Sequence, residues 1–215
     1  MNNYITAILL IIYLPKVAYL WVRENWKALT IAIGSTLALL VIFYNFGNRE
    51  MTSNRYTDND VAVNFQDLTA AFATGGKRTM QVEMIAIHHT AGNAKIKVYD
   101  LAKYQFQKFG NVAYHFLVMP DGTIYQLRPL EERVPHAYGC NDNAIAVCLA
   151  GNFNDYPVPE VQRKTALRLC RWLLKKYKLE ASNVLAHGEL TIYSPNNVTD
   201  CCGKMFDIKK FRQEL

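Results

Sequence analysis

The apolar residues of this chain are most concentrated near its N-terminus. Residues 29–46 (LTIAIGSTLALLVIFYNF) contain no charged side chain and present no polar face. About 18 such residues are enough for a helix to cross the core of a bilayer, so we predict a membrane-spanning helix there. Residues 4–22 are also apolar but are interrupted by Pro15 and Lys16. They form either a second span or a helix that lies in the membrane interface.

The charges around these segments predict their orientation. Lys16, Arg23 and Lys27 all precede residues 29–46, and positively charged flanks stay in the cytoplasm. Everything after the span is therefore expected on the opposite side of the membrane. A cleaved signal peptide fits poorly, because the apolar region is long and lacks a small-residue cleavage pattern. The polar residues 48–60 are typical of a tether.

Beyond the tether, short apolar runs alternate with segments of helical periodicity. Residues 61–76 are weakly helical or irregular, and Pro120-Asp121-Gly122 marks a tight turn between two strands. Gly110 and Pro159 stand where one helix ends and another begins. The predicted strands are 83–88, 113–118, 123–127, 144–150 and 184–187, and the predicted helices are 98–109, 159–179 and 206–215. The expected buried face of the long helix comprises Val161, Thr165, Leu169, Trp172, Leu173 and Tyr177.

Strands that alternate with helices indicate an α/β fold with a mixed central β-sheet flanked by helices. We expect a membrane anchor of one or two apolar helices at residues 1–47, a linker and irregular lead-in at 48–78, and the α/β domain at 79–215. The formal net charge of +6 favours an anionic polymer or surface as a partner. Because no dense basic run is interleaved with aromatic residues, no nucleic acid is expected as a partner.

Two histidines and a cysteine are the candidates for a metal site. His88 and His187 each follow an apolar run at the end of a predicted strand, and Cys201 lies further along in a polar loop. Two imidazoles and one thiolate suit a tetrahedral Zn²⁺ whose fourth position is open to water. A histidine at a strand end is also commonly a hydrogen-bonded core residue. The spacing alone leaves both interpretations open.

Five separated motifs occur in order along the chain. They are Ile87-His88-His89-Thr90-Ala91-Gly92, Ala113-Tyr114-His115-Phe116 before Asp121-Gly122-Thr123, His136-Ala137 ahead of Asn143-Ala144-Ile145-Ala146-Val147, Ala186-His187-Gly188-Glu189, and Thr199-Asp200-Cys201-Cys202-Gly203. From about residue 80 to the C-terminus, the chain resembles the zinc-dependent N-acetylmuramoyl-L-alanine amidases. That family includes amidase-type phage lysozymes and the peptidoglycan recognition proteins, and the resemblance implies their fold.

The resemblance also implies roles for individual residues. The expected ligands of Zn²⁺ are His88, His187 and Cys201. The expected catalytic residues are Tyr114 and Thr199, the latter at a position that is often Lys or Thr in the family. The expected lining of the substrate groove includes His136 and Asn143.

Some positions depart from the family pattern. Cys202 follows the expected zinc cysteine where family members usually have proline, so which of the two sulfurs binds metal is open. Ala144 and Ala146 replace the usual Ser and Gly, which would alter the wall of the groove.

The remaining histidines and cysteines have simpler expected roles. His89 and His115 are expected to be structural, and Cys148 and Cys170 to be buried thiols. The four cysteines other than Cys201 could form two disulfides in an oxidising compartment, which the sequence cannot pair.

Together these features predict a monomeric, membrane-anchored peptidoglycan hydrolase, for wall remodelling or for lysis. It would cut the amide between N-acetylmuramic acid and L-alanine of the stem peptide, on the extracytoplasmic side of a bacterial inner membrane. One alternative is a module that binds peptidoglycan without cleaving it; recognition proteins of that kind typically lack the zinc cysteine, whereas Cys201 is present here. Another is that the anchored end has its own activity, such as a holin-like membrane lesion.

Overall fold

The computed structural model describes residues 52–58, 61–74 and 76–215, with side chains from Val63 onward. The chain divides into two compact units, Met1–Glu50 and Met51–Leu215, and the second is described here. The predicted membrane segments at 4–22 and 29–46 lie outside the described residues. Within the described ranges, no helix has the length and apolar character needed to cross a bilayer.

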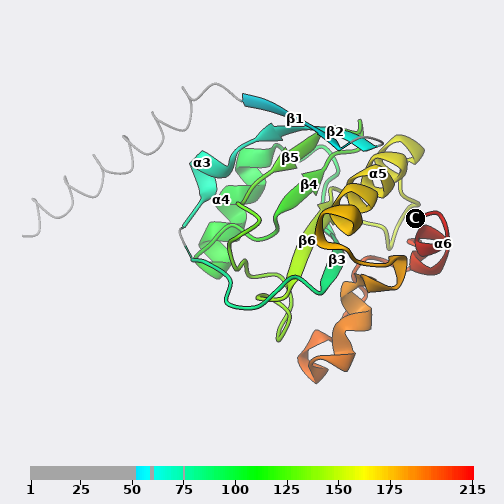
Figure 1. Ribbon diagram of the computed structural model, residues 1–215. Coiled ribbons are helices and arrows are strands. Elements are labelled where there is room, and N and C mark those ends of the chain that lie inside the picture. The colour runs from blue at the N-terminus through cyan, green and yellow to red at the C-terminus, as the bar shows by residue number, and fades with distance from the viewer. Residues whose placement is uncertain (1–51, 59–60, 75) are drawn as a thin grey trace, which may run out of the picture. The chain divides into compact units, whose positions relative to one another are not determined.

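The domain is built on a seven-stranded mixed sheet with the order β1-β2-β5-β4-β6-β3-β7 (Figure 1). The strands are β1 (Thr52–Asp58), β2 (Val61–Asp67), β3 (Met84–His89), β4 (Phe116–Val118), β5 (Ile124–Gln126), β6 (Ala144–Leu149) and β7 (Val184–Ala186). β3 runs parallel to both of its neighbours, β6 and β7, whereas β4 and β5 form an antiparallel hairpin. The predicted α/β fold with a mixed sheet is confirmed.

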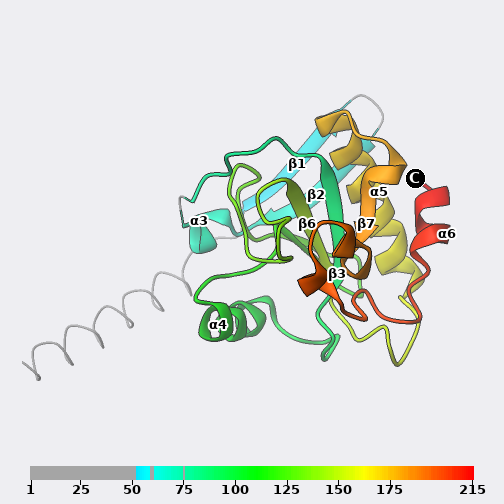
Figure 2. The ribbon, with the colours of Figure 1, turned by 90° about the horizontal axis from the view of Figure 1, so that it is seen from below.

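Helices cover both sides of this sheet. They are α3 (Thr69–Phe72), α4 (Val98–Phe109), α5 (Glu160–Tyr177) and α6 (Ile208–Gln213), with short 3-10 helices η1 (Ala181–Asn183), η2 (His187–Ile192) and η3 (Pro195–Asn197). Figure 2 shows α5 and α6 on one side of the sheet and α4 on the other. Gly110 ends α4 with φ +68°, a conformation that costs glycine no steric strain. Pro159 was predicted in the first turn of the long helix, and in the structure it directly precedes α5.

The two faces of β3 belong to different clusters of buried side chains. Ile85 and Ile87 lie in the main core, which also contains Trp172 of α5 and Phe211 of α6. Met84 and Ala86 belong to a second, smaller cluster on the other face. Because successive side chains of a strand alternate between faces, His88 points to this second face, away from α5.

Two local predictions are wrong. The stretch predicted as a tether and an irregular lead-in contains strands β1 and β2, which pair antiparallel at one edge of the sheet. In β2, Val63 and Phe65 are buried and Asn64 is exposed, which is the alternation of a half-covered strand.

In α5, Val161 was expected in the core but is 56% exposed. The buried residue in that turn is Gln162, whose Nε2 donates to the carbonyl oxygens of Val118 and Ala150 at 2.9 and 3.0 Å. A glutamine can therefore face the core here, because its amide N–H groups bond carbonyl oxygens at the end of β4 and just after β6.

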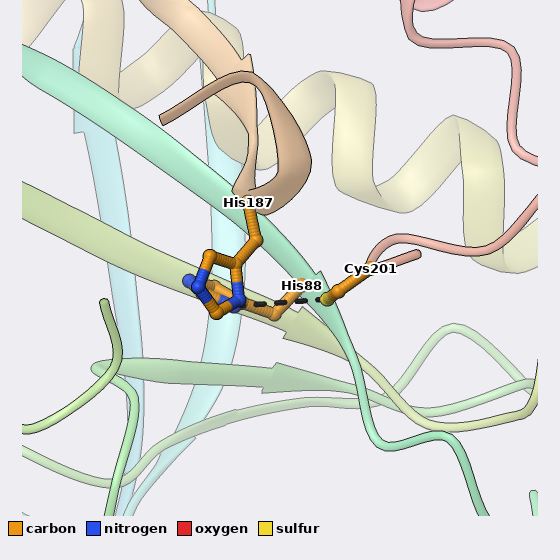
Figure 3. Close-up of side chains that lie close together, drawn as sticks. All are labelled: His88, His187 and Cys201. Atoms are coloured by element: carbon orange, nitrogen blue, oxygen red, sulfur yellow. Dashed lines mark hydrogen bonds between the residues drawn. The ribbon is translucent and has the colours of Figure 1, made fainter. Parts of the chain in front are cut away.

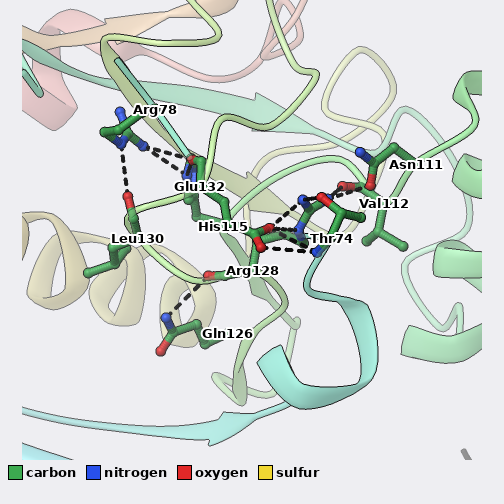
Figure 4. Close-up of polar contacts among 9 residues, drawn as sticks. All are labelled: Thr74, Arg78, Asn111, Val112, His115, Gln126, Arg128, Leu130 and Glu132. Atoms are coloured by element: carbon green, nitrogen blue, oxygen red, sulfur yellow. Dashed lines mark hydrogen bonds and ion pairs between the residues drawn. The ribbon is translucent and has the colours of Figure 1, made fainter. Parts of the chain in front are cut away.

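A buried polar network ties the lead-in to the loop that follows β5 (Figure 4). Arg128 is fully buried, and its Nε donates to Glu132 Oε2 at 2.7 Å. The same carboxylate accepts from the backbone N–H of Thr74 at 3.0 Å. His115 Nε2 lies 3.0 Å from Arg78 Nη2, and burial lowers the pKa of His115 to about 3, so this ring is neutral. His115 is therefore part of the framework.

Candidate metal centre

Three side chains from separate parts of the chain converge on the face of the sheet that points away from α5. His88 lies near the end of β3, His187 begins η2 directly after the adjacent strand β7, and Cys201 comes from the following loop. Their candidate ligand atoms all lie within 4.8 Å of one another (Figure 3). The two imidazole centroids are 4.7 Å apart, and Cys201 Sγ lies 3.8 Å from His88 Nδ1.

A close approach of two backbone segments brings Cys201 to the histidines. The N–H of Gly188 donates to the carbonyl oxygen of Cys201 at 2.8 Å. A Cβ at position 188 would lie 2.8 Å from the carbonyl oxygen of Thr199, so only glycine allows this contact without displacement. The N–H of His89 then donates to Cys201 Sγ at 3.3 Å, which directs the sulfur towards the ring of His88.

The geometry distinguishes the two adjacent sulfurs. Cys201 belongs to the cluster of three, whereas Cys202 is 4% exposed and its Sγ donates to the carbonyl oxygen of Ile87 at 2.8 Å. Cys202 therefore points into the sheet. Of the two sulfurs that the sequence left open, Cys201 is the one placed to bind a metal.

The protonation states of these groups suit metal binding. Hydrogen bonds from the Cys202 thiol, His187 and His88 lower the pKa of Cys201 to about 2, so its sulfur is a thiolate. Burial lowers the pKa of His88, which keeps its imidazole neutral. Two imidazoles and one thiolate form the donor set of a zinc site that keeps a fourth position for water. The residues present therefore fit Zn²⁺.

His136 contacts the ring of His88 from the side away from Cys201. Its Nδ1 lies 3.1 Å from His88 Nε2, and burial lowers its pKa well below the usual value. If Nδ1 of His88 bound the metal beside Cys201, its Nε2 would carry the proton and donate to His136 Nδ1. Metal-binding histidines commonly donate their second ring N–H in this way, which fixes the orientation of the ring.

Replacing His136 with alanine is expected to weaken zinc binding about 10- to 100-fold, the usual cost of losing such a partner. Competition with a chromophoric chelator measures the affinity. Asn143→Ala is the matched control and should leave the affinity unchanged, because Asn143 bonds Glu83 and not a residue of the cluster. Equal affinities for wild type and His136→Ala would show that His136 does not orient His88.

Tyr114 also packs against His88. The ring centroids lie 5.0 Å apart, and Tyr114 has φ +68°, an uncommon conformation for a residue with a side chain. Its hydroxyl hydrogen-bonds to Cys148. Burial raises the pKa of Tyr114 well above its usual value, so the hydroxyl keeps its proton and remains a donor.

The other two predicted site residues lie differently. Thr199 Oγ1 accepts from the N–H of Cys201 at 3.2 Å, so Thr199 supports the cysteine loop. Asn143 directly precedes β6, and its Nδ2 donates to Glu83 Oε2 at 2.9 Å. The residue of β6 in register with His88 is Cys148, so Asn143 lies at the other end of the strand. The structure does not bring Asn143 to the three convergent side chains.

Two contacts of the site were not foreseen. Sequence reasoning did not pair His136 with His88, and no local pattern links residues so far apart in the chain. It also treated Cys148 only as a buried thiol. The alternation of Ala144, Ala146 and Cys148 along β6 does put this thiol on the same face as His88, and that signal was available. All five cysteines are free thiols.

The fold and its side-chain cluster define a domain of the peptidoglycan amidase and recognition-protein class. The family model for N-acetylmuramoyl-L-alanine amidase matches residues 78–204, and the chain belongs to this family. Among curated relatives, mouse peptidoglycan recognition protein 3 is 30% identical over 129 residues, covering 51% of this chain and 37% of that protein. Peptidoglycan-recognition protein SD of Drosophila melanogaster is 27% identical over 115 residues, covering 49% and 62%. The chain thus spans less than two thirds of the length of either relative.

Solved structures include members of both kinds. The endolysin N-acetylmuramoyl-L-alanine amidase LysCS from Clostridium intestinale superposes with a TM-score of 0.60 at 27% identity, covering 69% of this chain and 92% of that one. Drosophila peptidoglycan recognition protein SD superposes with a TM-score of 0.54 at 23% identity, covering 66% and 90%. The second likeness concerns the fold alone.

Proposed function

We propose that this protein is a zinc-dependent N-acetylmuramoyl-L-alanine amidase that cleaves the bond between N-acetylmuramic acid and L-alanine in peptidoglycan. The observation that carries the proposal is the convergence of His88, His187 and Cys201 within 4.8 Å. Membership of the amidase family and the likeness to an endolysin amidase support the same reaction. A module that only binds peptidoglycan is the alternative, because the curated relatives are recognition proteins.

His88 and His187 would hold the metal from the end of β3 and the start of η2. Cys201 would hold it from the loop that contacts Gly188. Bound zinc supplies a Lewis acid for the scissile carbonyl and lowers the pKa of its water towards ~7. Tyr114 keeps its proton and its ring lies against His88, which supports the proposal that its hydroxyl turns from Cys148 to donate to the oxygen that becomes negative. His136 holds the ring of His88, and its own Nε2 is buried without a partner among the described residues.

Replacing Tyr114 with phenylalanine is expected to lower kcat about 100-fold, as for the loss of one donor to a developing oxyanion. Zinc affinity should stay within a factor of about two, because the ring that packs on His88 is retained. Muropeptide turnover and chelator competition, measured on the same preparation, separate the two effects. An unchanged kcat would show that the Tyr114 hydroxyl takes no part in the reaction.

The direct test is digestion of purified peptidoglycan by the full-length chain in detergent. Amidase action releases a stem peptide with a new free amine on L-alanine, which amine labelling and mass spectrometry detect. Full zinc occupancy together with retention on peptidoglycan, but no new amine, would favour the binding module.

We also propose that residues 29–46 anchor the protein in a bacterial inner membrane, with the amidase domain on the extracytoplasmic side. The uncharged stretch and the basic residues before it support this placement. A periplasmic reporter fused after Leu215 should be active, and activity of a cytoplasmic reporter at the same position would overturn the topology.

A further inference from the structure

Two cysteines stand next to each other in the loop that completes the metal centre. Cys201 lies with His88 and His187. The proposed reaction uses only that sulfur, so the neighbouring thiol of Cys202 has no role in it. Cys202 is nevertheless held in a defined position, because its Sγ donates to the carbonyl oxygen of Ile87 at 2.8 Å.

The two sulfurs lie against the same short piece of β3. Cys201 Sγ accepts from the N–H of His89 at 3.3 Å, while Cys202 bonds the carbonyl of Ile87. A covalent bond between them would therefore require no second segment of the chain to move.

Their exposure sets an order of attack. Cys201 is partly exposed, whereas the buried Cys202 is only 4% exposed. A small disulfide from solution would therefore reach Cys201 first, and Cys202 would be the thiol that attacks next.

We propose that Cys201 and Cys202 form a reversible disulfide with each other, and that this modification removes the cysteine ligand of the metal centre. Zinc binding and oxidation by small-molecule disulfides then compete for the same sulfur. Formation of the bond depends only on the two cysteines, whereas its effect on zinc rests on the proposed function.

The reaction balances with glutathione disulfide as the oxidant. The Cys201 sulfur attacks one sulfur of that disulfide, whose S–S bond breaks, and the first glutathione leaves as a thiolate that takes up a proton. Cys202 then loses its proton and attacks Cys201 Sγ, which expels the second glutathione. The Cys201 thiolate and the Cys202 thiol together lose two electrons and one proton, and one glutathione disulfide becomes two glutathiones, which take up that proton and one from solvent.

Cys148 is the competing partner for Cys201. It lies on β6 in register with His88 of β3, and it is completely buried. Its thiol is engaged with the hydroxyl of Tyr114, and it belongs to a different strand. The pair formed by Cys201 and Cys202 is therefore the one the geometry favours.

The test uses the full-length chain, stripped of metal with a chelator and incubated with glutathione disulfide. Wild type should lose two of its five thiols and the mass of two hydrogen atoms. Trypsin releases residues 179–204 as one peptide that contains Cys201 and Cys202 and no other cysteine, whereas Cys148 falls in peptide 134–163. The lost mass should lie within peptide 179–204. The oxidised protein should bind no zinc until dithiothreitol restores both thiols, and zinc added beforehand should slow the oxidation.

Two variants make the result specific. Cys202→Ala should stop at the mixed disulfide and gain one glutathione on Cys201, whereas Cys140→Ala should behave as wild type. Retention of all five thiols, a stable mixed disulfide on wild type, or a cross-link between peptides 134–163 and 179–204 would each overturn the proposal. If reduced wild type binds no zinc, the proposed function fails, while the thiol count and the peptide masses still decide whether the disulfide forms.

Discussion

Replacing His187 with alanine is expected to abolish zinc binding and to lower amidase activity at least about a thousandfold. The reason is geometric: His187 is one of three ligand-bearing side chains, and its ring lies 4.7 Å from that of His88. Removal leaves two protein ligands, which hold zinc poorly. The Lewis-acid contribution lost with the metal amounts to several kcal/mol, and each 1.36 kcal/mol is a factor of ten in rate.

Metal analysis and thermal unfolding give readouts that do not depend on activity. A ligand that binds only the folded state raises the melting temperature, so zinc should stabilise wild type and leave His187→Ala unaffected. Far-ultraviolet circular dichroism checks that the variant is folded. Full zinc content with full activity in this variant would eliminate the proposed centre.

Cys201 and Cys202 provide a matched pair of controls for the same centre. Cys201→Ser should lose zinc, because its sulfur belongs to the cluster. Cys202→Ser should keep zinc, because a serine hydroxyl can still donate to the carbonyl of Ile87 in place of the thiol. The reverse result would show that Cys202, and not Cys201, is the metal ligand.

The sequence predicted best those elements whose own residues carry a clear hydrophobic pattern. Four apolar residues of β3 indicated a strand covered on both faces, and the periodicity of residues 98–109 together with Gly110 defined α4. β2 was missed although Val63 and Phe65 alternate with polar residues. One of its partners, β1, lies directly before it in the polar stretch that was taken for a tether, and the other, β5, lies far along the chain. Pairing with a distant strand leaves no local signal.

The site shows the same division. His88, His187 and Cys201 were found because their motifs occur in the family order, and the structure then brings them together. The contact of His136 with His88 was not found, because it depends on how a distant loop crosses the end of β3. Asn143 differs: its place in a motif suggested a groove residue, which stays a prediction, and the structure shows its side chain bonded to Glu83.

Replacing Glu132 with alanine is expected to lower the free energy of unfolding by roughly 3–5 kcal/mol, the usual cost of leaving a buried charge without its partner. Arg128 is fully buried, and the Glu132 carboxylate that it bonds also accepts from the N–H of Thr74. The variant would leave the buried Arg128 guanidinium without its counter-charge and the N–H of Thr74 without this acceptor, at the point where the lead-in is fastened to the loop that runs on to His136.

Glu160→Ala is the control for this last prediction, because it removes a carboxylate that also pairs with an arginine, Arg163, but at the surface. The Glu160 side chain is 57% exposed, and surface pairs contribute about 0–1 kcal/mol. Chemical denaturation of both full-length variants in the same detergent measures the difference. A large loss for Glu132→Ala and a small one for Glu160→Ala would show that the buried network stabilises the domain, whereas equal small losses would show that Arg128 is satisfied without Glu132.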